Sequence, residues 1–409
     1  MAKFWFISAP LPGHLDWGGV LRTARTLHAQ GHEVLWVSGA QIAPLVDLPF
    51  AAIAETGWLW PPPPTPDFTT MKPADAVFLR YRRALDTWLS EDLMPPAVQC
   101  LLDLAAQRGK PDLIVTDPFL SASAFAAEAL DVPLAVAGWP AGQPLDVAHM
   151  YAVQSDLSHI SHERIARLCT RFGVQGVNFS GGAAPSVQSE HLHLSFFSRE
   201  WHQAEPDFLP QTQFVGGVAP APLPEPDWLA AIPTIARCAL ITLGSTFTGD
   251  LGFFSWAAQA SARLGLVPIV VIGGNPFVPE QKAQLKAALP AGTRLLNWIE
   301  YDAVFPRLAI LIHHGGMGTT HRAIVQGIPQ VVVPHAADQR GQAKRVAQAK
   351  IGLHLSAHDV RNGQLLPAIR AVLTDQQVLE NARGLAERFA ALGGVERAAG
   401  LLAELAANV

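Results

Sequence analysis

The chain has 409 residues, a length at which domain statistics predict about two or three domains. Hydrophobic residues make up 49% of it and charged residues only 15%, a composition that argues against disorder and allows more than one sizeable core. The net charge is −5, from 29 Lys and Arg against 34 Asp and Glu, and no basic run occurs. The composition therefore argues against nucleic-acid binding.

The sequence also lacks signals of a membrane or secreted protein. No apolar run approaches ~18 residues, so no transmembrane helix is expected. The apolar stretch at residues 4–7 is too short for a signal peptide and is broken at Pro10, which favours a buried first strand. Cys100, Cys169 and Cys238 are widely spaced and form no CxxC, so we expect reduced thiols in a cytoplasmic protein.

Short apolar runs alternate with longer helical patterns along the whole chain, which predicts βαβ units and parallel sheets. Leu21 to Ala29 is the first predicted crossover helix, ended by Gly31, and Ala74 to Leu104 is expected to be mostly helical. The first series of predicted strands covers 3–9, 33–38, 50–54, 112–116 and 133–137. The second covers 238–243, 267–272, 294–298, 309–312 and 330–333.

A proline-rich stretch divides the two series. Seven prolines lie between Ala204 and Pro233, a density that resists regular structure and stiffens a spacer. We therefore predict an N-terminal domain over 1–203, a linker over 204–233 and a C-terminal domain over 234–390. A final helix over 391–409 is expected to pack back toward the N-terminal domain.

The first predicted catalytic group is a histidine and a carboxylate at two strand ends. In a doubly wound sheet of order 3-2-1-4-5, the first and fourth strands are neighbours at the switch point where ligands bind. His14 follows the first strand and Asp117 follows the fourth, so the two should face each other. A carboxylate beside an imidazole suits a general base. The alternative is that His14 caps a helix and Asp117 bonds loop amides.

The second half repeats this geometry with different residues. Its first strand ends before Gly244, Ser245 and Thr246, and its fourth ends in His313 and His314, followed by a glycine-rich turn and a helix. Glycines allow close approach of the backbone, and amides at a helix N-terminus favour an anion, so a diphosphate is the expected guest. The predicted nest consists of Gly315, Gly316, Met317, Gly318 and Thr319.

The histidines give weak evidence for a metal. His313 and His314 are adjacent, and adjacent residues rarely point at one ion without further ligands nearby. The pairs His28/His32 and His354/His358 have i,i+4 spacing but no HExxH motif, and we interpret them as surface or packing residues. We predict no metal site.

Taken together, these motifs resemble those of a known family. The run from His313 to Thr320, with Pro334, Asp338 and Gln339 beyond it, resembles the nucleotide-sugar signature of GT-B glycosyltransferases. Pro12 to Leu15 resembles the catalytic-histidine motif of the family, and Val115 to Phe119 the segment with its partner aspartate. The nearest group is the UDP-glycosyltransferase-like family that modifies small lipophilic molecules, including bacterial natural products and carotenoids. The likeness covers essentially the whole chain.

The resemblance implies a fold and a set of roles. The fold is GT-B, with two Rossmann-like doubly wound domains facing across a cleft. His14 would deprotonate an acceptor hydroxyl, supported by Asp117. The donor phosphates would be bound by Gly244, Ser245, Thr246, His313 and the nest from Gly315 to Thr319. Trp298 would stack on the nucleobase with Ile299 beside it, and Asp338 and Gln339 would bind sugar hydroxyls.

Three positions depart from the family pattern. In the family, the stacking tryptophan is followed by one residue and then by Pro-Gln. Trp298 is followed instead by Ile299, Glu300 and Tyr301, so contacts to the edge of the nucleobase are expected to differ. His321 stands where UDP-specific members carry a ribose-binding glutamate, which weakens the case for UDP over dTDP. Met317 contributes no strong hydrogen bond, so the backbone must bind the phosphate there.

The expected reaction is a metal-independent, inverting transfer of a hexose to a lipophilic hydroxyl, without a cofactor. UDP-glucose is favoured over dTDP-glucose as the donor, and a monomer or weak dimer is expected. A nucleotide-sugar epimerase on the same fold and a silent homologue that binds a partner enzyme are the alternatives. The aromatic loops after the first-half strands favour an acceptor pocket. Its candidates are Trp58, Trp60, Phe68, Phe78, Trp139, Met150 and Tyr151.

Overall fold

The computed structural model describes residues 1–16, 18–61, 63–64, 66–143, 152–182, 185–203, 205, 207–244, 251–274, 277–335 and 339–408. The chain forms two compact units. Unit 1 comprises Met1–Phe196, Ala204–Val215 and Val395–Val409, and unit 2 comprises Phe197–Gln203 and Gly216–Gly394. Each unit is described by itself.

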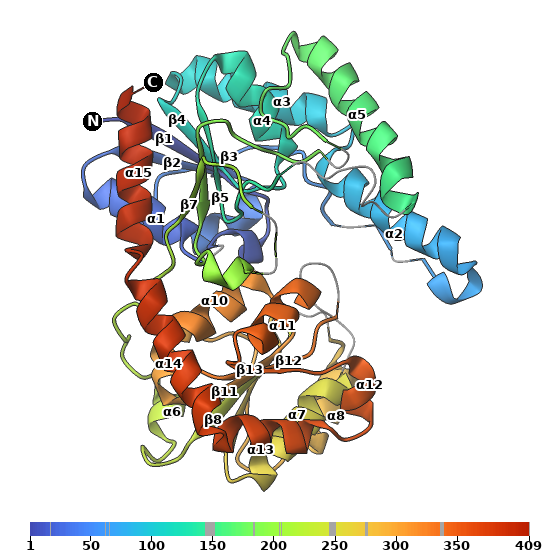
Figure 1. The fold of residues 1–409 in the computed structure, drawn as a ribbon, viewed down its shortest axis with the longest axis vertical. Coiled ribbons are helices and arrows are strands. Elements are labelled where there is room, and N and C mark those ends of the chain that lie inside the picture. The colour runs from blue at the N-terminus through green and yellow to red at the C-terminus, as the bar shows by residue number, and fades with distance from the viewer. Residues whose placement is uncertain are drawn as a thin grey trace. The chain divides into compact units, whose positions relative to one another are not determined.

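Unit 1 is built on a parallel sheet of order β3-β2-β1-β4-β5-β6-β7 (Figure 1). This confirms the predicted order of the first five strands and adds two that were not predicted, β6 and β7. The strands are β1 Lys3–Ile7, β2 Glu33–Ser38, β3 Phe50–Ala52, β4 Leu113–Thr116, β5 Leu134–Ala137, β6 Leu192–Ser195 and β7 Thr212–Phe214.

Helices connect these strands. They are α1 Val20–Ala29, α2 Pro73–Trp88, α3 Met94–Arg108, α4 Ser121–Leu130, α5 Ala152–Phe172 and α15 Gly394–Asn408, with 3-10 turns η1 Pro12–His14, η2 Ala40–Leu45 and η3 Phe68–Thr70. The segment from Ala74 to Leu104, predicted to be mostly helical, consists of two helices. Pro95 and Pro96 lack amide hydrogens and fit only the first turn of a helix, so a new helix, α3, begins at Met94.

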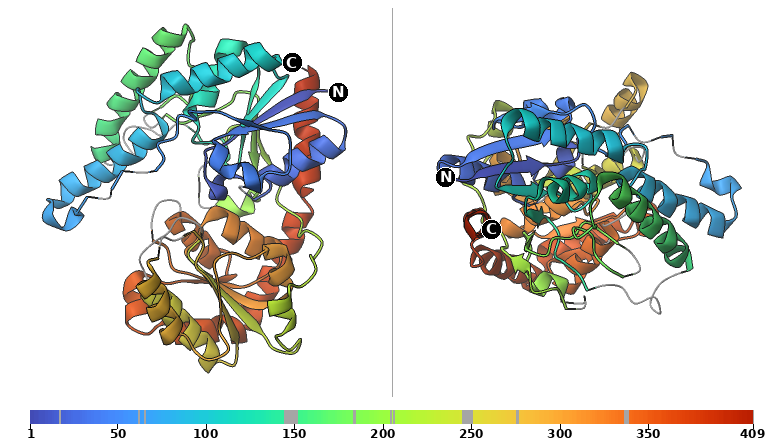
Figure 2. Two further views of the ribbon diagram at one scale, coloured as in Figure 1. Left: turned by 180° about the vertical axis from the view of Figure 1, so that it is seen from behind. Right: turned by 90° about the horizontal axis from the view of Figure 1, so that it is seen from above.

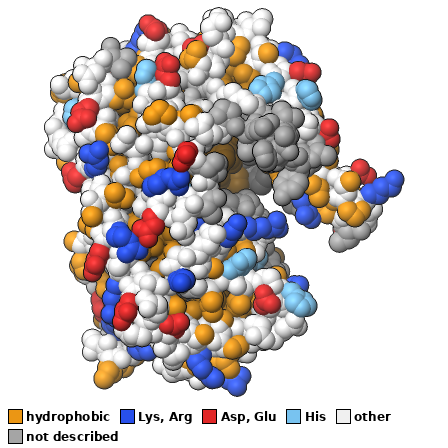
Figure 3. All heavy atoms as spheres, in the orientation of Figure 1, with side chains coloured by type: hydrophobic (Ala, Val, Ile, Leu, Met, Phe, Trp, Pro, Cys, Tyr) orange, Lys and Arg blue, Asp and Glu red, His pale blue; other side chains and the backbone are white. Residues whose placement is uncertain are grey.

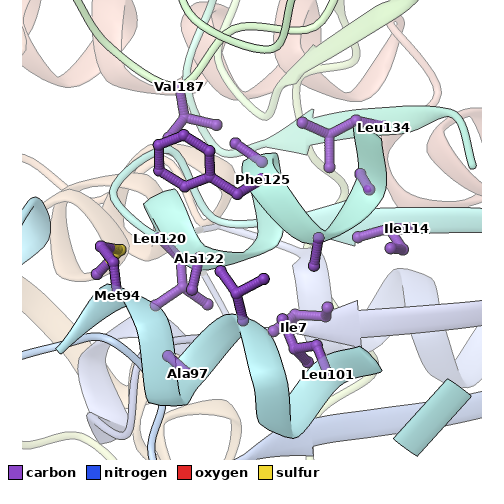
Figure 4. Packing of buried hydrophobic residues seen from close by; sticks show 14 of the residues in the cluster. Ile7, Met94, Ala97, Leu101, Ile114, Leu120, Ala122, Phe125, Leu134 and Val187 are labelled. Atoms are coloured by element: carbon purple, nitrogen blue, oxygen red, sulfur yellow. The ribbon is translucent and has the colours of Figure 1, made fainter. Parts of the chain in front are cut away.

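The sheet of unit 1 is buried on both faces, which explains why its strands are continuous apolar runs. Trp5 and Ile7 lie in one core cluster, to which α3 and α4 contribute Met94, Leu101 and Phe125. Figure 4 shows the side chains of α3 and α4 packed together over the strands. On alternate positions of β1, Phe6 stacks on Trp36 with ring centroids 5.7 Å apart. This two-sided burial fixes the strand ends that carry the candidate site.

Helices α2 and α5 lie side by side and extend from the sheet of unit 1, as both views in Figure 2 and the view in Figure 1 show. Arg164 of α5 is buried and joins them. It donates to Leu89 O at 2.9 Å and to Asp86 Oδ1 at 2.6 Å. A buried guanidinium bonded to two partners holds α5 against the end of α2.

Unit 2 repeats the doubly wound pattern with a parallel sheet of order β10-β9-β8-β11-β12-β13. Its strands are β8 Cys238–Thr242, β9 Val267–Val271, β10 Arg294–Leu296, β11 Leu308–His313, β12 Gln330–Val332 and β13 Gly352–His354. Its helices are α6 Asp227–Ala230, α7 Leu251–Arg263, α8 Pro279–Ala288, α9 Tyr301–Val304, α10 Met317–Val325, α11 Gln339–Gln348, α12 Ala357–Arg361, α13 Leu365–Thr374 and α14 Gln376–Ala390, with η5 Glu200–His202 and η6 Phe305–Arg307.

The proline-rich segment 204–233 is more structured than a linker. It contains β7, which pairs with β6 in unit 1, and α6, which packs in unit 2 through the buried Leu229. The chain passes from unit 1 to unit 2 at Gly216 within this segment. The C-terminal residues from Val395 belong to unit 1, where Glu396 accepts a hydrogen bond from Thr26 at 3.4 Å.

Among the described residues, no helix is long and apolar enough to span a membrane. Acidic and basic side chains are interspersed over the described surface seen in Figure 3. This face shows no continuous basic area of the kind that binds nucleic acids.

Candidate functional site

The predicted histidine–carboxylate pair is formed in unit 1. His14 ends η1, directly after β1, and Asp117 follows β4, which pairs with β1 through Ile7 and Thr116. His14 Nδ1 lies 3.3 Å from Asp117 Oδ2. Parallel pairing of β1 and β4 therefore brings the two side chains together at the carboxyl edge of the sheet.

Asp117 is buried and held by the loops around it. Its Oδ2 also accepts from the Ala9 amide at 2.9 Å, and its Oδ1 accepts from the Phe119 amide at 2.8 Å. The sequence leaves open whether Asp117 contacts His14 or accepts hydrogen bonds from loop amides. In the structure it does both. These bonds fix the carboxylate, so His14 Nδ1 must carry the hydrogen and donate it. In that tautomer, Nε2 carries the lone pair.

Aromatic side chains surround His14. The Trp58 ring lies 5.1 Å and the Phe119 ring 6.2 Å from the imidazole, measured between centroids. Trp139 contacts Phe119 at 6.5 Å. Trp58 and Trp139 are predicted residues of the acceptor pocket, whereas the sequence indicates Phe119 only as part of the aspartate motif. The position of Phe119 two residues after Asp117 is the sequence feature that could have placed it in the site.

The other acceptor candidates have different surroundings or are not described. Trp60 is 44% exposed, and Phe68 stacks under the Arg80 guanidinium at 4.5 Å. Phe78 is partly buried against the core of unit 1. Met150 and Tyr151 lie outside the described residues.

In unit 2, the structure separates the two adjacent histidines. His313 is fully buried, its Nδ1 accepts from the Gly315 amide at 3.1 Å, and its Nε2 donates to Gln330 Oε1 at 2.9 Å. Burial lowers the pKa of His313 to about 4. Both ring nitrogens are therefore used inside the fold, and the role of diphosphate contact predicted for His313 does not fit this geometry.

The His314 ring packs against two glycines of the predicted phosphate site. A β-carbon added to Gly244 would lie 2.7 Å from His314 Cε1, and one added to Gly316 would also collide with the ring. The imidazole thus lies between the ends of β8 and β11, at the carboxyl edge of the sheet. Burial lowers the pKa of His314 to about 3, so the ring is neutral near pH 7. A neutral imidazole has one N–H to donate, and His314 forms a hydrogen bond with the backbone of Thr242 inside unit 2.

The glycine-rich turn leads into α10 and leaves space around the first residues of this helix. Gly315 has a φ of +91°, and Gly316 is the N-cap of the helix. Met317 is only 5% exposed, so its side chain is directed into unit 2 and its backbone forms the turn. A β-carbon on Gly318 would meet no atom within 4 Å. Such an open helix N-terminus can bind an anion through its amides. Ser245 and Thr246 lie outside the described residues.

Of the residues predicted for the nucleoside, one is accessible. Trp298 is 53% exposed in the loop between β10 and α9, which suits a stacking surface. Ile299 is 4% exposed and packs in a core cluster with Phe305 and Leu311, so its side chain does not form part of a nucleoside site.

His321 is also directed into the core. Its Nε2 lies 3.3 Å from Gly216 O, and its ring is 5.4 Å from the Phe197 ring and 6.1 Å from the Phe389 ring. Helical periodicity explains this, because positions 317, 320, 321 and 324 of α10 share its buried face. The predicted ribose role of His321 is therefore inconsistent with its position.

For the predicted sugar site, the structure describes Gln339 but not Asp338. Gln339 begins α11, and its Oε1 accepts from the His335 amide at 2.9 Å. This bond orients the side chain at the end of the loop that follows β12. Asp338 lies outside the described residues.

Comparisons with known proteins agree with this architecture. Residues 270–404 match the family described as "Erythromycin biosynthesis protein CIII-like, C-terminal domain". The chain is 29% identical over 160 residues to the NDP-glycosyltransferase YjiC of Bacillus subtilis (strain 168), covering 39% of this chain and 40% of that protein. It is 26% identical over 406 residues to the elloramycin glycosyltransferase ElmGT of Streptomyces olivaceus, covering 94% and 93%. The match to YjiC thus spans less than half of that relative.

Solved structures match over nearly the whole chain. The glycosyltransferase of kitacinnamycin has a TM-score of 0.76 at 21% identity, with 99% of both chains covered. The spinosyn rhamnosyltransferase SpnG, complexed with thymidine diphosphate, has a TM-score of 0.69 at 21% identity, covering 98% of this chain and 99% of that one. The predicted GT-B fold is confirmed, and the chain is similar over nearly its whole length to a bacterial natural-product glycosyltransferase.

Proposed function

We propose that the protein is an inverting, metal-independent glycosyltransferase that moves a hexose from a nucleoside diphosphate sugar to a hydroxyl of a lipophilic small molecule. The observation that carries this proposal is the contact of 3.3 Å between His14 Nδ1 and the buried Asp117. Half-buried aromatic side chains beside this pair supply an apolar surface for an acceptor.

In the proposed reaction, His14 is the general base. Its Nε2 takes the proton of the acceptor hydroxyl while the acceptor oxygen forms a bond to the anomeric carbon. The bond from that carbon to the phosphate oxygen breaks, and its electron pair leaves with the nucleoside diphosphate. Displacement from the opposite side inverts the anomeric centre. Asp117 stabilises the imidazolium that forms and keeps Nδ1 protonated.

Unit 2 is proposed to bind the donor. The amides at the start of α10 would stabilise the diphosphate as negative charge develops on it, whereas the rings of His313 and His314 are both bonded inside unit 2. Gly244 and the backbone of Met317 are proposed to belong to the same surface, with Ser245 and Thr246 extending it. These groups supply positive potential without a metal ion. The Thr319 hydroxyl, which was also predicted for this surface, is hydrogen-bonded to the Tyr301 side chain.

Trp298 is proposed to stack on the nucleobase, and Asp338 and Gln339 to bind the sugar hydroxyls. An acid–amide pair both accepts from and donates to ring hydroxyls, which favours a fully hydroxylated hexose such as glucose. UDP-glucose is the proposed donor and dTDP-glucose the second candidate. The thymidine diphosphate bound to SpnG supports the second, and the inward position of His321 leaves the choice to the nucleobase contacts.

The experiment is a turnover assay with UDP-glucose and dTDP-glucose, each against a panel of phenols and terpenoid alcohols. Mass spectrometry detects the glycoside, and NMR coupling constants give the anomeric configuration. We expect a β-glucoside from an α-linked donor. Conversion of the nucleotide sugar to its epimer without an acceptor would indicate an epimerase. Absence of any glycoside, with UDP and dTDP failing to raise the unfolding temperature, would contradict the proposal.

A further inference from the structure

Four aromatic rings line the carboxyl edge of the unit 1 sheet. Trp58 follows β3, His14 follows β1, Phe119 follows β4 and Trp139 follows β5. Neighbouring rings in this series have centroids 5.1, 6.2 and 6.5 Å apart and are inclined by 63°, 57° and 61°. Trp58 and Phe119 also meet directly, at 6.5 Å. We call these four residues the aromatic wall.

Apart from His14, each residue of the aromatic wall has its backbone hydrogen-bonded to a buried polar side chain. Thr56 Oγ1 accepts from the Trp58 amide at 3.4 Å, and Asp117 Oδ1 accepts from the Phe119 amide at 2.8 Å. His193 Nδ1 lies 3.0 Å from the Trp139 carbonyl. Thr56, Asp117 and His193 are all buried, whereas Trp58, Phe119 and Trp139 remain partly exposed.

The histidine behind Trp139 has a defined tautomer. His193 Nε2 accepts from the Ser189 amide at 2.9 Å, so Nδ1 carries the hydrogen and donates it to the Trp139 carbonyl. Burial lowers the pKa of His193 to about 4, which keeps this arrangement neutral near pH 7. The wall is therefore ordered before a ligand binds, and preorganisation reduces the entropic cost of binding.

On the basis of the proposed glycosyl transfer, we infer that the aromatic wall selects an acceptor whose hydroxyl is carried by a flat aromatic ring system. Rings inclined by about 60° offer a face and an edge in succession, the two arrangements that aromatic pairs prefer. A flat acceptor can stack on one ring and meet the edge of the next. A saturated acceptor of the same size gains only the burial of its surface.

The expected discrimination follows from the strength of aromatic pairs. Each pair contributes about two- to twelvefold in affinity beyond area burial. Two such contacts give roughly tenfold or more between a planar acceptor and its saturated counterpart. A phenolic hydroxyl, with a pKa near 10, also yields its proton to an imidazole more readily than an aliphatic alcohol does.

A matched pair of acceptors tests this inference. 2-Naphthol and decahydro-2-naphthol share one carbon skeleton and differ in aromaticity. Binding of each to the whole protein is measured by calorimetry without a donor, and kcat/KM is measured with UDP-glucose and dTDP-glucose. We expect 2-naphthol to bind at least about tenfold more tightly and to be the better acceptor.

Variants locate the selectivity. Phe119→Leu and Trp139→Leu keep an apolar side chain but remove a ring, and each should raise the KM for 2-naphthol several-fold while the KM for the donor stays unchanged. Decahydro-2-naphthol should bind equally to wild type and variants. Trp60→Leu is the matched control, because Trp60 is 44% exposed in the loop that contains Trp58. Unfolding temperatures show whether a variant is folded.

The outcomes separate this inference from the proposed function. The inference would be overturned if both compounds bound with equal affinity or if neither bound. It would also be overturned if the variants weakened binding of both compounds to the same extent. Transfer to decahydro-2-naphthol as efficient as to 2-naphthol would leave the glycosyltransferase proposal intact and remove the selectivity. Preferential binding of 2-naphthol without transfer from either donor would support the wall and contradict the catalytic proposal for these donors.

Discussion

The imidazole of His314 lies against the α-carbon of Gly316, with no room between them for a β-carbon. Gly316 has a φ of −62°, which any residue can adopt, so its lack of a side chain matters for the ring and not for the backbone. Gly316→Ala should displace the imidazole, shift the turn whose amides are proposed to bind the diphosphate, and weaken binding of UDP and dTDP by roughly tenfold, as expected for one lost amide hydrogen bond to a phosphate. Calorimetry of both nucleotides measures the change.

Two comparisons control that experiment. His314→Ala should cost a similar factor, and the double variant with Gly316→Ala should be no worse than His314→Ala alone. Additive losses would show that the methyl group acts independently of the ring. Gly318→Ala adds a methyl group in the same turn where no atom lies within 4 Å, and it should leave the unfolding temperature unchanged or raise it.

His14→Ala should lower kcat by about 10²–10⁴, the usual contribution of a general base, and leave donor affinity unchanged. Asp117→Asn should act in the same direction and more weakly, because an amide still offers an oxygen to Nδ1. Steady-state kinetics with the acceptor and donor varied in turn measure both effects. Turnover of His14→Ala at the wild-type rate would remove this residue from the mechanism.

Stability should fall as the pH decreases from about 6.5 to 4. Burial lowers the pKa of His193 and His313 to about 4 and that of His314 to about 3. In this window the unfolded chain binds protons that the folded chain excludes, so acid favours unfolding by up to about 1.4 kcal/mol per pH unit for each histidine. Unfolding by urea at a series of pH values measures the slope. His193→Gln should reduce it, whereas His28→Gln, on the exposed face of α1, should not.

Chelation should not reduce activity. The proposed diphosphate site uses the amides at the start of α10, which act without an ion. Activity after incubation with EDTA and gel filtration is compared with that of an untreated sample. A loss that Mg²⁺ or Mn²⁺ restores would show that the leaving group needs a cation.

Asp338→Ala should nearly abolish glucosyl transfer while UDP still binds, because the proposed sugar site would lose its acceptor for ring hydroxyls. A competition assay gives the donor preference of the wild type. It contains UDP-glucose, dTDP-glucose and a dTDP-deoxysugar at equal concentration. Preferred use of the deoxysugar, with activity retained in Asp338→Ala, would assign a different role to this residue.

The sequence predicted the elements that carry a strong hydrophobic pattern and missed those that do not. The strands that precede His14 and Asp117 are continuous apolar runs buried on both faces of a sheet, and their order was predicted correctly, although β1 ends at Ile7 and not at residue 9. Strands β7 and β13 have three residues each and gain their structure from pairing with a neighbour, which a local pattern does not show.

The site shows the same division. The motif located the two adjacent histidines but not their surroundings, because the hydrogen bonds of each ring depend on neighbouring strands that the motif does not contain. His313 shares a face with Gln330 on the neighbouring strand, and their bond inside the fold decides its role. His321 was assigned by its distance along the sequence, whereas the turn of α10 directs it inward. Phe119 was adjacent to a recognised motif and became part of the site through ring contacts alone.

Unit 1 is assembled from three stretches of chain, and its last stretch begins at Val395, after all of unit 2. During synthesis, Gly216 to Gly394 therefore leave the ribosome before the helix that completes unit 1. Because domains tend to fold as units as they emerge, unit 2 can reach its native state while unit 1 still lacks its final helix. Unit 1 is thus the first unit to be synthesised in part and the last to be completed.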